Sequence, residues 1–86
     1  MKMNNKVLVE ISVPAAAKKY DVYIPLESRM CEVTKMVAGA LSDLSDGKYK
    51  ATNEAILCDA ETGIIFNVNM EIAELGIKNG SRLMLI

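Results

Sequence analysis

Apolar and polar residues alternate in two neighbouring segments near the start of the chain. In residues 6–13 every second position is apolar, and Pro14 ends the run. Residues 20–25 repeat the alternation. A period of two is typical of strands with one buried face, so both segments are predicted to be half-buried strands. They are expected to pair as a β-hairpin. The loop between them carries no Asn-Gly turn signal, so this pairing is inferred from proximity along the chain.

The apolar positions change to helical spacing after these strands, and a helix is predicted over residues 29–44. Ser28 stands where a helix N-cap is expected, and Gly47 is placed to end the helix in a left-handed conformation. The apolar residues at this spacing are Met30, Val33, Val37, Ala40, Leu41 and Leu44.

Shorter elements are predicted in the second half of the chain. Residues 54–59 read as a short strand, Gly63 as a turn leading into a further strand at 64–66, and residues 82–86 as a terminal strand. The element order is therefore ββαβ(β)β. It predicts an α+β fold in which a mixed sheet of four to five strands packs on one helix, with residues 1–86 forming a single domain.

Charge and hydropathy exclude several classes of partner. Among 86 residues, 24% are charged and the formal net charge is -1. The basic residues are scattered, and Lys18-Lys19 is the only adjacent pair, so nucleic acid is not an expected partner. The apolar runs are far too short to cross a bilayer, and the start of the chain lacks a signal-peptide hydrophobic region. We therefore expect a cytoplasmic protein that does not insert directly into a membrane.

The residue inventory also argues against an enzyme. The chain has no histidine, which excludes Ser-His-Asp and Cys-His devices and makes a zinc site unusual. Cys31 and Cys58 are interpreted as reduced, partly buried thiols. Glu71 and Glu74 lie close in sequence but have no phosphate loop or aromatic shelf beside them, so they read as solvated turn residues. We expect no catalytic site, no metal and no cofactor.

A motif near the end of the chain carries a family resemblance. It reads Gly76-Ile77-Lys78-Asn79-Gly80-Ser81-Arg82-Leu83. Together with the element order, it resembles the ubiquitin-like superfamily with its β-grasp fold, and most closely the small bacterial YukD/EsaB-type proteins of type VII (ESX/WXG100) secretion systems. Taken alone, the motif is a turn followed by a strand. The resemblance implies a non-conjugated interaction module, an accessory or regulatory component of the secretion machinery. Its implied partners are cytoplasmic parts of that machinery or a regulator.

An alternative function is a β-grasp modifier or sulfur carrier that is charged at its C-terminus. That role requires a flexible tail ending in Gly-Gly, whereas this sequence ends at Ile86 beside its last predicted strand. The alternative is therefore disfavoured.

The candidate binding site is an apolar patch on the outer face of the predicted sheet. If Leu83 and Leu85 point toward the helix, Met84 and Ile86 must point away from it. The resemblance places Ile56 on the same outer face with Leu8 close by, where ubiquitin keeps its partner-binding patch. The alternative is that the N-terminal residues or a second copy cover Met84 and Ile86. The predicted partner-binding residues are Leu8, Ile56, Met84 and Ile86.

Overall fold

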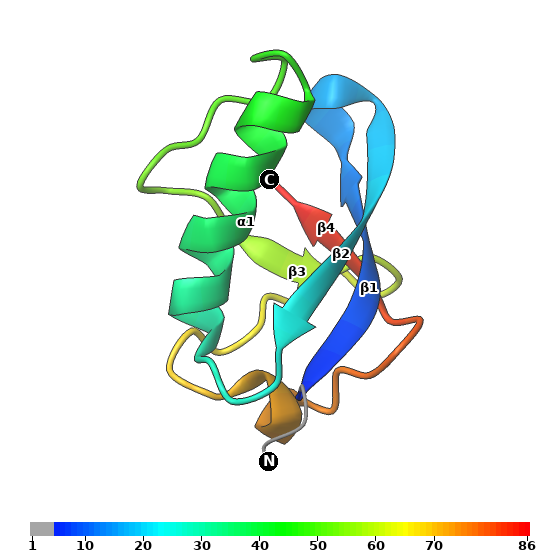
Figure 1. Cartoon of the computed structure of the whole chain (residues 1–86), viewed down its shortest axis with the longest axis vertical. Coiled ribbons are helices and arrows are strands. Elements are labelled where there is room, and N and C mark those ends of the chain that lie inside the picture. Colours follow the sequence, from blue (N-terminus) through cyan, green and yellow to red (C-terminus); the bar gives the residue numbers. More distant parts are fainter. Residues whose placement is uncertain (1–4) are drawn as a thin grey trace.

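The computed structural model describes residues 5–86, and in this range one helix lies against one face of a four-stranded sheet (Figure 1). Two short 3₁₀ turns complete the regular structure. This arrangement confirms the α+β fold of a mixed sheet on one helix. In chain order the elements are β1 (Lys6–Val13), a 3₁₀ turn (Pro14–Ala16), β2 (Lys18–Pro25), α1 (Met30–Leu44), β3 (Leu57–Asp59), a 3₁₀ turn (Ile72–Leu75) and β4 (Arg82–Leu85).

The strands are arranged in the order β2-β1-β4-β3, so the last strand of the chain lies inside the sheet. β1 and β2 form the predicted antiparallel hairpin, with pairing from Lys6 opposite Pro25 to Val13 opposite Lys18. β4 runs parallel to β1 on one side and antiparallel to β3 on the other. One face of β4 points to the helix, with Leu83 and Leu85 in the core, and the other face belongs to the outer side of the sheet.

The core lies between the sheet and α1. Alternate residues of β1 and β4 point into it, as the alternation of apolar residues predicts, and the helix contributes a matching apolar stripe. The side chains that are almost completely buried there include Val9, Ile11, Val13, Ile24, Met30, Val33, Val37, Leu41, Leu57, Ile72, Leu83 and Leu85.

The helix begins one residue later than predicted, and Ser28 is not its N-cap. Arg29 occupies that position, and its backbone N–H donates to Glu32 Oε1 at 2.9 Å. Ser28 instead takes part in the contact with the 3₁₀ turn, because its carbonyl accepts a hydrogen bond from the Ile72 N–H. Ser28 is thus held by a contact with a segment distant in sequence and lies one residue before the N-cap.

The helix also turns a slightly different face to the sheet than its sequence predicts. Leu44 is 62% exposed and Ala40 is exposed, whereas Ala38 and Thr34 are buried. The buried Thr34 hydroxyl donates to the Met30 carbonyl, which satisfies it within the helix. The helix ends at Leu44 as predicted, but the left-handed residue directly after its C-cap Ser45 is Asp46 at φ +55°, and Gly47 follows it at φ +80°.

The two short strands predicted after the helix are only partly present. β3 covers Leu57–Asp59 rather than residues 54–59. Residues 64–66 form no strand, and only Ile65 makes an isolated bridge, to Cys58. The turn at Gly63 is confirmed, since its N–H donates to the Asp59 carbonyl. This tight turn brings 64–66 back along β3 for too few residues to build a continuous ladder.

Candidate functional site

The outer face of the sheet, which points away from α1, carries the predicted binding residues. Across the centre of this face, Ser12, Met84 and Cys58 lie side by side on β1, β4 and β3. Ile86 follows Met84 by two residues, just beyond the end of β4, and it exchanges two backbone hydrogen bonds of 2.9 Å with Ile56. Because directly paired residues of antiparallel strands point to the same face, these two isoleucines lie beside Met84 and Cys58.

Three of the four predicted site residues therefore come together, and we call Ile56, Met84 and Ile86 the β3–β4 patch. Ile86 is 53% exposed, while Ile56 and Met84 are half-buried. The patch is thus partly packed against its own sheet rather than fully solvated. Clustered apolar side chains at a protein surface are typical of interaction sites, whereas single ones carry no such meaning.

Leu8 points to the same face but does not join this patch, so its predicted proximity is wrong. It pairs with Tyr23 of β2, and its carbonyl accepts a hydrogen bond from the Gly80 N–H. Since Met84 pairs with Ser12, Leu8 lies four residues away along β1, roughly 13 Å at the usual rise of a strand. Leu8 and the 63% exposed Tyr23 form a separate apolar spot at the other end of the face.

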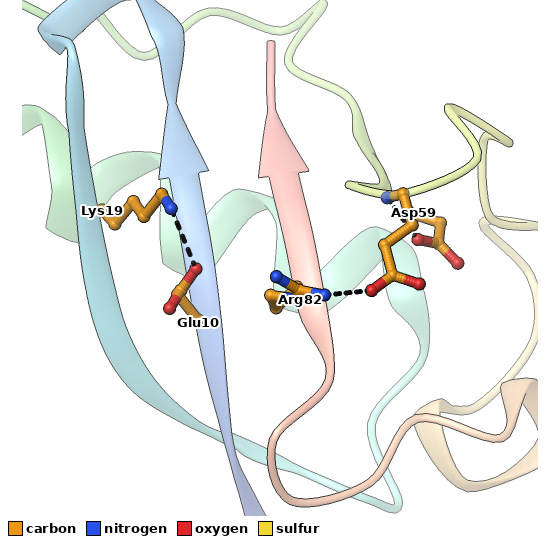
Figure 2. A network of polar contacts seen from close by, with 5 residues as sticks. Glu10, Lys19, Asp59 and Arg82 are labelled. Atoms are coloured by element: carbon orange, nitrogen blue, oxygen red, sulfur yellow. Dashed lines mark hydrogen bonds and ion pairs between the residues drawn. The ribbon is translucent and has the colours of Figure 1, made fainter.

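A row of charged side chains separates the two apolar areas. Glu10 and Arg82 are paired positions on β1 and β4, and Figure 2 shows their side chains between Lys19 and Asp59. Lys19 Nζ lies 3.8 Å from Glu10 Oε2, and Arg82 forms an ion pair with Glu61. These pairs are largely exposed and contribute little stability. The row does, however, give the β3–β4 patch a charged border along one side.

Cys58 forms the floor of the β3–β4 patch, although the sequence argument did not place it there. It is only 2% exposed, and its thiol donates weakly to the Met84 carbonyl at 3.7 Å. Burial raises the pKa of the Cys58 thiol, and the neighbouring Asp59 carboxylate raises it further. The signal was available, since Cys58 follows Ile56 by two residues and so shares its face. Cys31, in contrast, is exposed, and neither cysteine is in a disulfide.

The motif residues have structural roles in joining β1 to β4. Asn79 Oδ1 accepts a hydrogen bond from the Leu8 N–H at 2.8 Å, and the next residue, Gly80, donates back to the Leu8 carbonyl. Gly80 adopts φ +88°, which a residue with a side chain rarely does. The Asn-Gly pair thus extends the parallel pairing beyond the last ladder residue.

The acidic residues in the tail also serve the fold. Glu74 accepts a hydrogen bond from the Glu71 N–H at 2.9 Å and caps the 3₁₀ turn. Glu71 and Glu74 therefore have a structural role in this turn. Within residues 5–86, no cluster of three or more metal-ligating side chains is present. No helix in the same range has the length and apolar character needed to cross a membrane.

Comparison with known proteins gives a family match over almost the whole chain. The family model described as "WXG100 protein secretion system (Wss), protein YukD" matches residues 8–85. No curated protein sequence gives a significant match.

Solved structures with the same fold include domains from mycobacterial type VII secretion proteins. The ubiquitin-like domain of EccD1 from Mycobacterium tuberculosis superposes with a TM-score of 0.75 at 14% identity, covering 94% of this chain and 97% of that one. The EccD5 ubiquitin-like domain from Mycobacterium xenopi gives 0.77 at 16% identity, covering 94% and 92%. A chain of the ESX-5 inner membrane complex gives 0.73 at 19% identity, covering 95% of this chain but 21% of that one. At these identities the likeness shows a common ubiquitin-like fold.

Proposed function

Because the chain belongs to the YukD family of WXG100 secretion-system proteins, we propose that it is a non-enzymatic protein-interaction module of a bacterial type VII secretion system. In this proposal it acts in the cytoplasm as an accessory or regulatory component and is not conjugated to other proteins. The observation that supports the interaction role is the β3–β4 patch, which gathers Ile56, Met84 and Ile86 at one end of the outer sheet face.

The shape of this patch suits a binding surface. Its exposed member, Ile86, is held to half-buried Ile56 by two backbone hydrogen bonds, so the backbone of this surface is already ordered before a partner binds. The charged row along its border supplies polar contacts around an apolar centre, which is the usual anatomy of a protein interface. A second copy of the chain on the patch is the competing explanation, and it predicts a dimer rather than a complex with another protein.

The proposed partner is a cytoplasmic part of the secretion machinery. Support comes from the ESX-5 inner membrane complex, where a domain of the same fold occupies about a fifth of a longer chain. Such domains are therefore compatible with assembly around a membrane complex. A regulator of the system is the other partner class that this proposal includes.

The test combines folding, binding and secretion measurements on matched surface variants. Ile86→Ser removes an exposed member of the patch, and Tyr23→Ser removes a somewhat more exposed apolar residue from the other end of the same face. Both should melt close to the unaltered protein. Binding to purified cytoplasmic domains of the secretion machinery should weaken by roughly 30-fold or more for Ile86→Ser, as for a central interface anchor. Secretion of WXG100 substrates should fall with it.

The Tyr23→Ser variant should keep both binding and secretion. If folded Ile86→Ser bound and secreted normally, the patch would not be the functional surface. The absence of conjugation is tested separately by intact-mass spectrometry after incubation with ATP and cell extract. The proposal expects an unchanged mass, and a covalent adduct at the C-terminus would contradict it.

A further inference from the structure

A second surface lies on the helix side of the molecule, between the first half of α1 and the segment that returns from the helix to β3. In Figure 1 this segment leaves the top of α1 and descends beside it. The space between them is a groove of about 520 Å³. Cys31 and Lys35 line its helix wall, Asn53 and Ile56 line the opposite wall, and Ile65 and Val68 lie at its end.

The groove is apolar in its floor and at its end. Its floor includes Met30 and Leu57, which belong to the buried core. Ile65 and Val68 are 58% and 49% exposed, so apolar surface continues from the groove onto the outside of the molecule. A small molecule held inside the groove would leave these two side chains in water. A longer amphipathic segment would cover them.

The charge in the groove is positive and unbalanced. Lys35 is the only charged side chain among the residues that line it, and no carboxylate within residues 5–86 lies at ion-pair distance from its ammonium group. The first N–H groups of the helix do not add an anion site, because Met30 and Cys31 donate theirs to the carbonyls of Met70 and Val68. A carboxylate on the occupant is therefore complementary to Lys35.

The neighbouring edge of the sheet cannot accept an added strand at this point. The outer side of β3 is already used by the returning chain, since the Asp59 N–H donates to the Ile64 carbonyl and Ile65 bridges Cys58. An extended peptide gains its affinity from a free strand edge, whereas a helix docks through side chains. The occupied edge thus favours a helical ligand.

We propose that the α1–β3 groove binds an amphipathic helical segment of another protein, with apolar side chains on one face and an Asp or Glu beside them that pairs with Lys35. The groove opens on the helix side of the sheet and shares Ile56 with the β3–β4 patch, whereas Met84 and Ile86 do not line it. The proposal does not depend on the type VII assignment. It would give the domain two protein-binding surfaces that adjoin at Ile56.

The experiment uses the full chain and a display library of helix-forming peptides of about 16 residues, which is roughly four turns. Enriched sequences are synthesised and titrated against the protein. The proposal expects apolar residues at helical spacing with an adjacent Asp or Glu. Lys35→Glu should weaken binding by about tenfold or more, and exchanging the acidic residue of the peptide for Lys should restore binding to this variant. Lys18→Glu, with the same charge change on the exposed β2 strand, should have no effect.

Two further readouts locate the bound peptide. Cys31 is exposed at the groove, so bound peptide should slow its modification by a small thiol reagent. Val68→Ser should weaken peptide binding while leaving the melting temperature close to that of the unaltered protein. Ile86→Ser should leave peptide binding unchanged. If Ile86→Ser loses partner binding but still binds the peptide, or if Val68→Ser loses the peptide but still binds the partner, the two surfaces act independently.

The proposal is overturned if no helical peptide is enriched, if the enriched peptides are basic, or if Lys35→Glu and Lys18→Glu weaken peptide binding equally. Unprotected Cys31 in the complex would also contradict it. A concentration-dependent dimer in sedimentation experiments that Val68→Ser dissociates would assign the groove to a second copy of the chain instead.

Discussion

Four consecutive apolar residues at the end of the chain differ in burial according to the face of the sheet on which they lie. Leu83 and Leu85 on the inner face are 1% and 0% exposed, while Met84 on the outer face is half-buried and Ile86 just after the strand is 53% exposed. All four are large apolar side chains. The difference teaches that the direction of a side chain, and not its type, decides its burial here: residues facing α1 are buried in the core, and those facing away stay partly exposed.

The largest effect that tests this comparison is expected from truncating the inner face. Leu85→Ala should lower the free energy of unfolding by about 2–5 kcal/mol, because the side chain is fully buried and β4 lies inside the sheet. Ile86→Ser, one residue later, should change it by no more than about 0.5 kcal/mol. Chemical denaturation of both variants measures the contrast. Equal decreases in the free energy of unfolding would mean that Ile86 contributes as much to stability as the buried Leu85.

The pairing of β4 with β1 is expected to depend on the side chain of Asn79. Asn79→Ala leaves the Leu8 N–H without its acceptor and should lower the free energy of unfolding by about 1 kcal/mol. Asn53→Ala is the matched control, since Asn53 is exposed. Denaturation curves of both variants give the comparison, and hydrogen exchange of the Leu8 amide should quicken in Asn79→Ala alone. An unchanged Leu8 amide would show that this contact does not hold β1 to β4.

The two cysteines offer a pH test of the same contrast between buried and exposed positions. Burial raises the pKa of the Cys58 thiol in the folded protein, so the unfolded chain loses its proton first as the pH rises. The stability from this group is complete below the ordinary thiol pKa of about 8.5 and is lost progressively above it. Unfolding should therefore become easier between about pH 8 and pH 10.

Replacing each cysteine identifies the source of this loss. Cys58→Ala should flatten the decline of stability over that pH range, and Cys31→Ala should leave it unchanged because Cys31 is exposed. Burial also raises the pKa of Tyr49, and its contribution remains in both variants. A decline of the same slope in all three proteins would assign the effect to groups other than Cys58.

The smallest effect is expected at the far edge of the core, on β2. The Tyr20 hydroxyl is buried and has no hydrogen-bond partner within residues 5–86. Tyr20→Phe removes this polar group and keeps the ring, so the protein should be unchanged or more stable by at most about 1 kcal/mol. Tyr23→Phe on the exposed face serves as the control and should be neutral. A clear loss of stability in Tyr20→Phe would reveal a bound water or another partner for the hydroxyl.

The elements with strong periodicity were predictable, and those held by distant contacts were not. The alternation in residues 6–13 and the helical spacing after Ser28 each indicated the correct element, because one buried face imposes its period on the sequence. The start of the helix, the length of β3 and the predicted strand at 64–66 were wrong in detail. The start of the helix and the extent of β3 depend on contacts with segments far along the chain, which a local pattern does not contain. Residues 64–66 instead return along β3 after the tight turn at Gly63 for too few residues to form a ladder.

The candidate site shows the same division. Alternation placed Met84 opposite in direction to Leu83 and Leu85, and it put Leu8 on the correct face. Only the parallel register, with Ser12 beside Met84, showed that Leu8 lies at the other end of that face. The burial of Cys58 likewise follows from its neighbours on β4 and at Ile65.

By itself, the sequence determined which side chains share a face, the order of the elements and the ubiquitin-like family, because periodicity and turn residues act over a few positions. The tertiary structure alone decided which faces meet. It set β4 between β1 and β3, brought Ile56 beside Ile86, and opened the groove between α1 and the returning chain. These features depend on strand register and on packing between segments distant in sequence. Both proposed binding surfaces combine residues from such segments, so a local pattern does not reveal them.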